Sequence, residues 1–389
     1  MFKVLLIISL SFCFISCGNA DKQKERLSLH NGRIAVEKMR IIATQPTEDE
    51  FEHLDDYLGD VSYVKLAKNP LLASVKDVHI SNGRIYIQDE MHRIVCYNMQ
   101  GEVLFLIDSR GSGPHEYAGI NAFAIDVNRK ELVIYDNLKL SLMYYSSENG
   151  KYAKTVRLEK PNFTEMVFVD GVCFYNNRYH HNYPSDHSLH YSLLTSTDGV
   201  NMEQRYFPHT DAEEESIFSP SHQTFYDNDS ECYYCRNFDN VIYRLSKDGL
   251  EARYKIELPN MLPQSEIERK TDVRALIKSN YSFGISNVYI CKNLLYYRFY
   301  KDGYIWAAFY DLKADKQICC AKSLRSKLFV RIPFFDVING VYENRFWGLL
   351  TPEFISYVMS KNSDSYPNIF HEYDPQSDNP ILAFYKVKL

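Results

Sequence analysis

The sequence predicts an all-β fold, a six-bladed β-propeller of four-stranded blades, on three observations. Of the 389 residues, 45% are hydrophobic and 14% aromatic, a globular composition that excludes a disordered chain. The chain repeats itself, because RIYIQD (84–89) aligns with ELVIYD (131–136), and Tyr97 with Tyr144, at one offset of 47 residues. Short β-branched or aromatic runs alternate with Gly, Asn and Asp turns. Four such runs in a repeat of about 40–50 residues are typical of propeller blades.

A third copy follows, because Tyr243 precedes Gly249 as Tyr144 precedes Gly150. Propagating this pattern along the chain gives five complete blades. Their strands are expected at 75–80, 84–88, 93–97 and 102–107; at 120–126, 131–135, 140–145 and 152–158; at 165–170, 172–176, 189–195 and 203–207; at 222–226, 231–235, 240–245 and 250–257; and at 285–290, 293–299, 304–311 and 316–321.

The sixth blade is one strand short at the C-terminus. It offers only 334–338, 345–350 and 381–387, whereas VSYVKL (61–66) precedes the first blade without a partner. Donation of 61–66 to the last blade would close the ring and remove an exposed strand edge. We therefore expect the propeller to span 61–389.

The first residues predict export. Lys3 precedes an apolar run from Val4 to Ile15, which is too short for the roughly 20 residues of a membrane-spanning helix. Phe14-Ile15-Ser16-Cys17 resembles a bacterial lipobox, which implies cleavage of a signal peptide (1–16) and acylation of Cys17; cleavage nearby without lipidation is the alternative. Residues 17–60 would then be a lipidated tether. The expected location is the cell envelope, at the outer membrane, with the facing left open.

Charge and cysteine content exclude other classes of protein. The net charge is −6 and the chain has no long Lys or Arg run, so a nucleic-acid partner is not expected. Without Cys13 and Cys17 the number of cysteines is odd, which argues against a full disulfide framework. Most of these cysteines should be free and buried.

The long connections all fall on one face of the predicted propeller. First-to-second and third-to-fourth strand turns are short, whereas the other face carries RGSGPHEY (110–117) and the segments 177–188, 208–221, 259–284 and 351–380. Helical spacing within 259–284, and Thr351-Pro352-Glu353, predict helices on that face. Long ordered loops on a rigid scaffold commonly carry function, so binding is expected there.

Two of these loops supply candidate ligand-binding residues. Arg110, His115, Glu116 and Tyr117 lie near the expected channel mouth, where a His/Glu pair suits acid–base chemistry or ligand contact. The alternative is structural, with Glu116 accepting backbone N–H bonds to fix the loop. The other loop is rich in histidine and supplies the candidates His181 and His187, with His180. Imidazoles suit zinc, but the spacing matches no metal motif, so a solvated loop is the alternative.

Two further features have structural interpretations. Asp89 and Asp136 recur at the ends of second strands, where an aspartate can bond its own turn backbone. The 31 tyrosines suit either sugar stacking or propeller strands, and composition alone does not decide between them.

The loop Gly111-Ser112-Gly113-Pro114-His115-Glu116-Tyr117 carries a family resemblance. A G-x-G-P-x-E-[FY] loop, followed by an apolar strand and a strand with tyrosine and aspartate near its end, resembles NHL-type propellers. It is especially similar to the six-bladed propeller lipoproteins of Bacteroides-like bacteria. The resemblance covers about 61–389, but the sharp motif occurs once.

These patterns favour a lipid-anchored binding module. It would bind a glycan, a small molecule or an envelope protein through its loop-rich face, with no cofactor and no catalysis required. The alternative is a metal-dependent hydrolase or lyase resembling gluconolactonase-like propellers, which hold a metal ion, with calcium or zinc as candidates here, by acidic and amide side chains at the channel mouth. A third interpretation, a structural envelope scaffold, predicts no ligand-sized polar cavity.

Overall fold

The structure of the chain is a computed structural model. The structure describes residues 29–47, 51–53, 57–158, 163–177, 187–209, 223–229, 231–236, 238–268, 273–325, 338–361 and 367–388.

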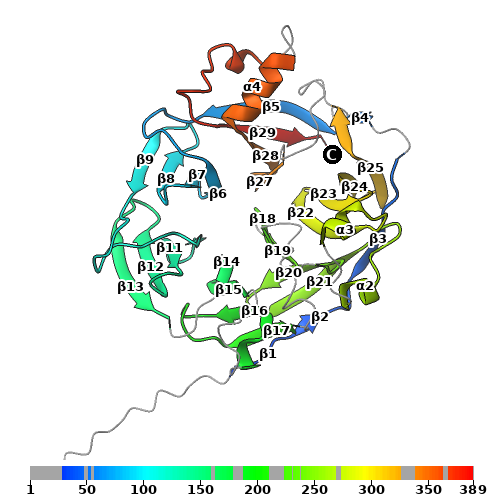
Figure 1. Cartoon of the computed structure of the whole chain (residues 1–389), viewed down its shortest axis with the longest axis horizontal. Coiled ribbons are helices and arrows are strands. Elements are labelled where there is room, and N and C mark those ends of the chain that lie inside the picture. The colour runs from blue at the N-terminus through cyan, green and yellow to red at the C-terminus, as the bar shows by residue number, and fades with distance from the viewer. Residues whose placement is uncertain are drawn as a thin grey trace, which may run out of the picture.

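The described strands form a ring of sheets in a propeller-like arrangement, with the first strand of each blade facing the centre (Figure 1). Four sheets stand as separate blades. They are β6 to β9 (Val75–Ser81, Arg84–Asp89, Ile94–Asn98, Val103–Ile107), β10 to β13 (Ala122–Asp126, Glu131–Asp136, Ser141–Ser146, Tyr152–Arg157), β14 to β17 (Phe163–Val169, Val172–Asn177, Tyr191–Ser196, Gln204–Pro208) and β22 to β25 (Phe283–Cys291, Leu294–Lys301, Tyr304–Asp311, Lys316–Ala321).

The other large sheet has ten strands, so the prediction of six separate blades is not confirmed. One half of it is β18 to β21 (Phe225–Asn228, Glu231–Cys235, Val241–Ser246, Gly249–Glu257), and the other contains β27 (Gly340–Tyr342), β28 (Arg345–Leu350) and β29 (Ile381–Val387). The halves join where Asn228 of β18 pairs in parallel with Val341 of β27. The predicted strand at 334–338 lies largely outside the described residues.

The predicted closure by an N-terminal strand is confirmed. β5 (Leu58–Lys65) pairs antiparallel with β29, from Ile381 opposite Lys65 to Val387 opposite Leu58. The buried side chain of Asn379 fastens the same junction, because it donates to the carbonyls of Ala67 (2.6 Å) and Pro70 (2.9 Å) and accepts from the Leu72 amide (2.8 Å). A strand from the N-terminal part of the chain and the last strand of the chain therefore complete one sheet.

The residues expected to form a tether also join the sheets. β1 (His30–Asn31) pairs with β17, β2 (Ile34–Ala35) and β3 (Arg40–Ala43) pair with β21, and β4 (Phe51–His53) pairs with β26 (Ser323–Arg325). All four pairings are parallel. This segment follows the outside of the ring from β1 towards β5 (Figure 1).

Burial explains why the central strands were predictable. β7 and β11, the two halves of the repeat, are buried at every position after the first, because neighbouring strands and sheets cover them on both faces. Among the described residues, the twelve largest fully buried side chains are all tyrosines. Tyr86 reaches across to the next sheet, where its hydroxyl donates to the Ser147 carbonyl (3.0 Å). Many tyrosines are therefore core residues. Seven cysteines are free and buried, as expected.

The predicted helices are present. α2 (Gln264–Glu268) and α3 (Val273–Lys278) lie between β21 and β22, and α4 (Pro352–Lys361) lies between β28 and β29. Thr351 caps α4, because its hydroxyl accepts from the Phe354 amide (3.3 Å). No helix within the described ranges has the length and apolarity needed to cross a bilayer.

Candidate functional site

The loop that contains Arg110 to Tyr117 is closed on itself by hydrogen bonds. The Gly111 amide donates to the Tyr117 carbonyl (2.9 Å), and Glu116 Oε2 accepts from the Gly113 amide (2.7 Å). The Lys139 ammonium adds bonds to the carbonyls of Gly113 (3.0 Å) and Glu116 (2.5 Å). The structural alternative for Glu116 is thus the one observed.

The other candidates in this loop also have structural contacts. Tyr117 is fully buried, and its hydroxyl donates to the His92 carbonyl (2.7 Å). His115 is exposed and its ring lies tilted beside that of Tyr152, with ring centroids 4.6 Å apart, and Arg110 is exposed. None of these loop residues lines either cavity of the channel described below.

The remaining sequence candidates are not placed in a site. Cys17 and His181 lie outside the described residues. His187 begins the short helix η2 (His187–Leu189), and its side chain is not among those described.

The aspartates at the ends of second strands behave as predicted. Asp89 accepts from the amides of Met91 and Arg93, both at 3.1 Å, and Asp136 accepts from those of Leu138 and Lys139, both at 3.0 Å. These carboxylates fix their own turns and are structural repeats.

Two cavities occupy the channel at the centre of the ring. The first, here called the loop-side chamber, has a volume of about 530 Å³. It lies where the links between sheets enter, since Asn121, Gln223 and Asn339 lie one or two residues before inner strands. The second, the turn-side chamber, measures about 710 Å³ and reaches the first hairpin turns, including Asn82 and Asp170. His79 and Asp227 line both chambers.

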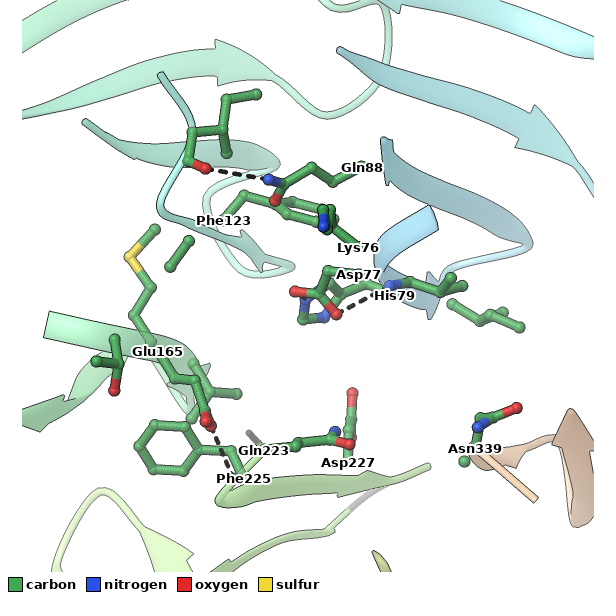
Figure 2. Close-up of a pocket in the computed structure, with 18 of the residues that line it drawn as sticks. Lys76, Asp77, His79, Gln88, Phe123, Glu165, Gln223, Phe225, Asp227 and Asn339 are labelled. Atoms are coloured by element: carbon green, nitrogen blue, oxygen red, sulfur yellow. Dashed lines mark hydrogen bonds and ion pairs between the residues drawn. The ribbon is translucent and has the colours of Figure 1, made fainter. Parts of the chain in front are cut away.

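Every inner strand contributes to the loop-side chamber. Figure 2 shows residues of β6, β14, β18 and the segment before β27 facing one space. The lining residues of the inner strands include Asp77 and His79 of β6, Phe123 of β10, Glu165 of β14, Asp227 of β18, Tyr289 of β22 and Val341 of β27. The site is therefore assembled from residues far apart in the sequence.

Glu165 has the most unusual environment in this chamber. Its Oε2 accepts from the Thr224 amide (2.7 Å), the Thr224 hydroxyl (3.0 Å) and the Phe225 amide (3.2 Å). Its Oε1 is buried and has no hydrogen-bond partner. Burial raises the pKa of Glu165 to about 7, and the three hydrogen bonds only partly oppose that shift. This carboxyl titrates near neutral pH.

Asp227 and His79 share the chamber. Asp227 is exposed to the channel, but the surrounding walls limit solvation of its charge, and this desolvation raises its pKa to about 6. Burial alone would lower the pKa of His79, but Asp77, whose Oδ2 lies 3.1 Å from its Nε2, raises it, so the net pKa shift is upward. Coulombic coupling to Asp227 and Glu165 adds to that rise.

Aromatic and aliphatic side chains supply the other half of the chamber wall. Phe123 packs edge-on against His79, with centroids 4.6 Å apart, and Phe225, Met166 and Trp347 also line the cavity. A cavity with an apolar wall and a few convergent polar groups with perturbed pKa values is the usual form of a small-molecule site.

The described residues include no cluster of three or more His, Cys, Asp or Glu side chains that could hold a metal ion.

A family model covers nearly the whole chain. Residues 42–386 match the family described as "Domain of unknown function (DUF4934)". The chain belongs to this family. No protein of curated function matches its sequence.

Two solved structures from Bacteroides show the same fold. A "Putative exported protein" from Bacteroides fragilis NCTC 9343 has 17% identity and a TM-score of 0.73, over 90% of this chain and 100% of its own. A member of the DUF4221 family from Bacteroides vulgatus has 12% identity and a TM-score of 0.50, over 85% and 97% of the two chains. At these identities the similarity establishes fold alone.

The sequence predicted binding among the sheet-to-sheet links, and it did not single out the inner-strand residues that line the loop-side chamber. The loop-side chamber opens among the sheet-to-sheet links, yet inner strands supply its polar groups. One signal was available, because KDVHI (76–80) and TEMV (164–167) place charged residues within predicted first strands. A charge in such a strand is costly unless it faces solvent, a partner or a channel.

Proposed function

We propose that this protein is an exported, lipid-anchored propeller of six blades that binds a small molecule in the loop-side chamber. One observation carries the binding proposal. Inner-strand residues from around the ring converge on a 530 Å³ cavity that holds two carboxyl groups with raised pKa values. No catalytic role is needed to account for these features.

The six-blade count is part of the proposal. The halves of the ten-stranded sheet join through a single pair, Asn228 with Val341, so each half is interpreted as one blade. Six inner strands, β6, β10, β14, β18, β22 and β27, line the loop-side chamber, as six blades would require. The NHL-like loop at 111–117 is consistent with this class of propeller.

Export and anchoring rest on the N-terminal sequence. The apolar run to Ile15 and the lipobox-like Cys17 support an outer-membrane lipoprotein, and the B. fragilis structure named above is that of a "Putative exported protein". Cys17→Ala should move the protein from the membrane to the soluble fraction of its native cells. Unchanged membrane retention would refute lipidation at Cys17.

The binding proposal can be tested with small probes of different chemistry. Pentylamine, pentanoate, 1-pentanol and methyl β-glucoside would be offered to the purified chain, with binding detected by ligand-observed NMR. We expect saturable binding of at least one probe. Asn121→Trp should abolish it, because the side chain of Asn121 is exposed, uncharged and lines the chamber.

Two variants complete this test. Leu104→Trp is the matched control, because Leu104 is exposed on the outer strand β9. This variant should bind the probes like the wild type. Val78→Phe narrows the same chamber from another strand, in case Asn121→Trp misfolds through loss of the bond from Asn121 to the Phe163 carbonyl. Binding unaffected by either chamber variant would place the site elsewhere.

A further inference from the structure

The charge of the loop-side chamber identifies a class of ligand, an inference that rests on the proposed binding function. We propose that the chamber binds an organic cation, an ammonium group on a short apolar stem, with its charge held by Glu165 and Asp227.

The other charged groups of the chamber are already paired. Lys76 lies 3.3 Å from Glu90, His79 lies 3.1 Å from Asp77, and Arg93 contacts Asp89 at 2.5 Å. The remaining imidazole, His92, accepts the Ile120 amide at Nδ1 (3.0 Å).

Glu165 and Asp227 are left without a cation. No basic side chain of the described residues forms an ion pair with either carboxylate, and Glu165 Oε1 has no hydrogen-bond donor. The next acids toward the turns are also engaged, since Asp229 accepts the Glu343 (2.6 Å) and Asn344 (2.9 Å) amides and Glu231 pairs with Arg244 (3.0 Å). Among the described residues, neither carboxylate is therefore in direct contact with a positively charged donor.

The chamber suits an organic cation better than a bare metal ion. Its volume of about 530 Å³ falls within the range of roughly 300–1,000 Å³ that small-molecule sites occupy. Phe123, Met166 and Phe225 offer apolar surface to a stem, and no described cluster has enough ligands for a metal. When the two carboxyl groups are ionised, they would repel an anion, and a neutral ligand would leave their charges uncompensated.

Binding of a cation is therefore coupled to proton release. Glu165 and Asp227 have pKa values of about 7 and about 6, and an ammonium group would favour their ionised forms. Affinity should rise as the pH increases from 5.5 to 8, because fewer protons then have to leave. His79 adds to this dependence, because, despite burial, its pKa is raised from 6.5, mainly by Asp77, and it is coupled to Asp227 and Glu165. Loss of its proton at higher pH removes a positive charge from the chamber and so favours the bound cation.

Isothermal titration calorimetry of the full chain with pentylamine tests the proposal. We expect saturable binding that is tighter at pH 8 than at pH 5.5, with protons released at pH 5.5, and no comparable binding of 1-pentanol or pentanoate. Glu165→Gln should weaken pentylamine binding by about tenfold or more. Glu148→Gln, which removes an exposed carboxylate paired with Lys130 outside the chamber, should change it less than about threefold.

The source of the ammonium can be distinguished in the same experiment. Nα-acetyl-lysinamide presents the group on a peptide, so tighter binding of this probe than of pentylamine would identify a lysine side chain as the ligand. Tighter binding of pentylamine would identify a free amine.

Three results would overturn the inference. The first is that 1-pentanol binds as tightly as pentylamine, and the second is that Glu165→Gln binds pentylamine with the affinity of the wild type. The third is that pentylamine at pH 8 does not saturate the protein up to about 10 mM, which corresponds to a binding free energy weaker than about −3 kcal/mol. If a neutral probe binds and Asn121→Trp abolishes that binding, the proposed function stands and this inference alone fails.

Discussion

The fold makes the ionised form of Glu165 unfavourable, because burial raises the pKa of this carboxyl group to about 7. Three donors on one oxygen fix the carboxyl, while the other oxygen is buried without a donor. Such a group destabilises the fold when it ionises, because its charge is poorly solvated. Residues kept in this state commonly serve a ligand rather than the fold.

The cost of this charge predicts a pH-dependent stability. The pKa of Glu165 rises from 4.5 to about 7 on folding, so its contribution is fully present below pH 4.5 and is lost as the pH rises towards 7. Glu165→Gln removes this loss, because an amide can keep its accepting oxygen toward Thr224 and does not ionise. We expect its free energy of unfolding to exceed that of the wild type by about 1–2 kcal/mol at pH 8, and by less at pH 5.

Urea denaturation at the two pH values measures this difference. Glu148→Gln is the control of opposite sign, because Lys130 lowers the pKa of the exposed Glu148, so its removal should bring no gain at pH 8. Equal stability of Glu165→Gln and wild type at pH 8 would show that the Glu165 charge is not strained.

At the scale of elements, the closure of the ring depends on a few buried polar contacts. β5 adds the outer strand beside β29, and Asn379 holds the chain that follows β5 by three hydrogen bonds. Asp378 assists, since its buried carboxylate contacts Lys65 at 3.2 Å and Lys68 at 2.6 Å. This junction ties the two ends of the chain together.

Asn379→Ala should therefore destabilise the protein by roughly 2–4 kcal/mol, because it leaves two carbonyls and one amide without their partners. Thermal or urea unfolding measures the effect. Asn149→Ala is the matched control, since Asn149 is exposed and makes one turn bond to the Lys151 amide, so its loss should cost about 0.5 kcal/mol. A similar small loss for Asn379→Ala would mean that the junction does not stabilise the ring.

The elements were easier to predict than their assembly. Strands β6 to β13 lie within one or two residues of their expected positions, because central strands buried on both faces give continuous apolar runs between turns. The union of β18 with β27 was not predictable, since it depends on one pair of residues distant in the sequence. The short strands β1 to β3 lacked a signal because two to four residues carry no periodicity.

The candidate site was largely hidden from the sequence for a related reason. Asp77, Glu165 and Asp227 come from three different sheets, and only the closed ring places them around one chamber. The Gly-rich loop at 110–117 attracted the prediction instead, because glycine, histidine and glutamate together resemble a functional loop. In the structure, that loop uses Glu116 to hold its own backbone.

For the whole molecule, the packing that stabilises the ring and the polar groups of the channel come from different residues. Tyrosine-rich packing between the sheets and the outer N-terminal strands support the ring, whereas the channel carries charge that the fold does not neutralise. The similarity to the Bacteroides structures concerns the fold of this ring and not the chemistry of the channel.

The most direct test of the account is a crystal structure of the protein with pentylamine bound at pH 8. The account predicts the ammonium group in the loop-side chamber, in contact with Glu165 Oε1 and Asp227, with the pentyl stem against Phe123 and Phe225. A chamber without the amine at saturating concentration, or an amine bound only elsewhere on the protein, would contradict it.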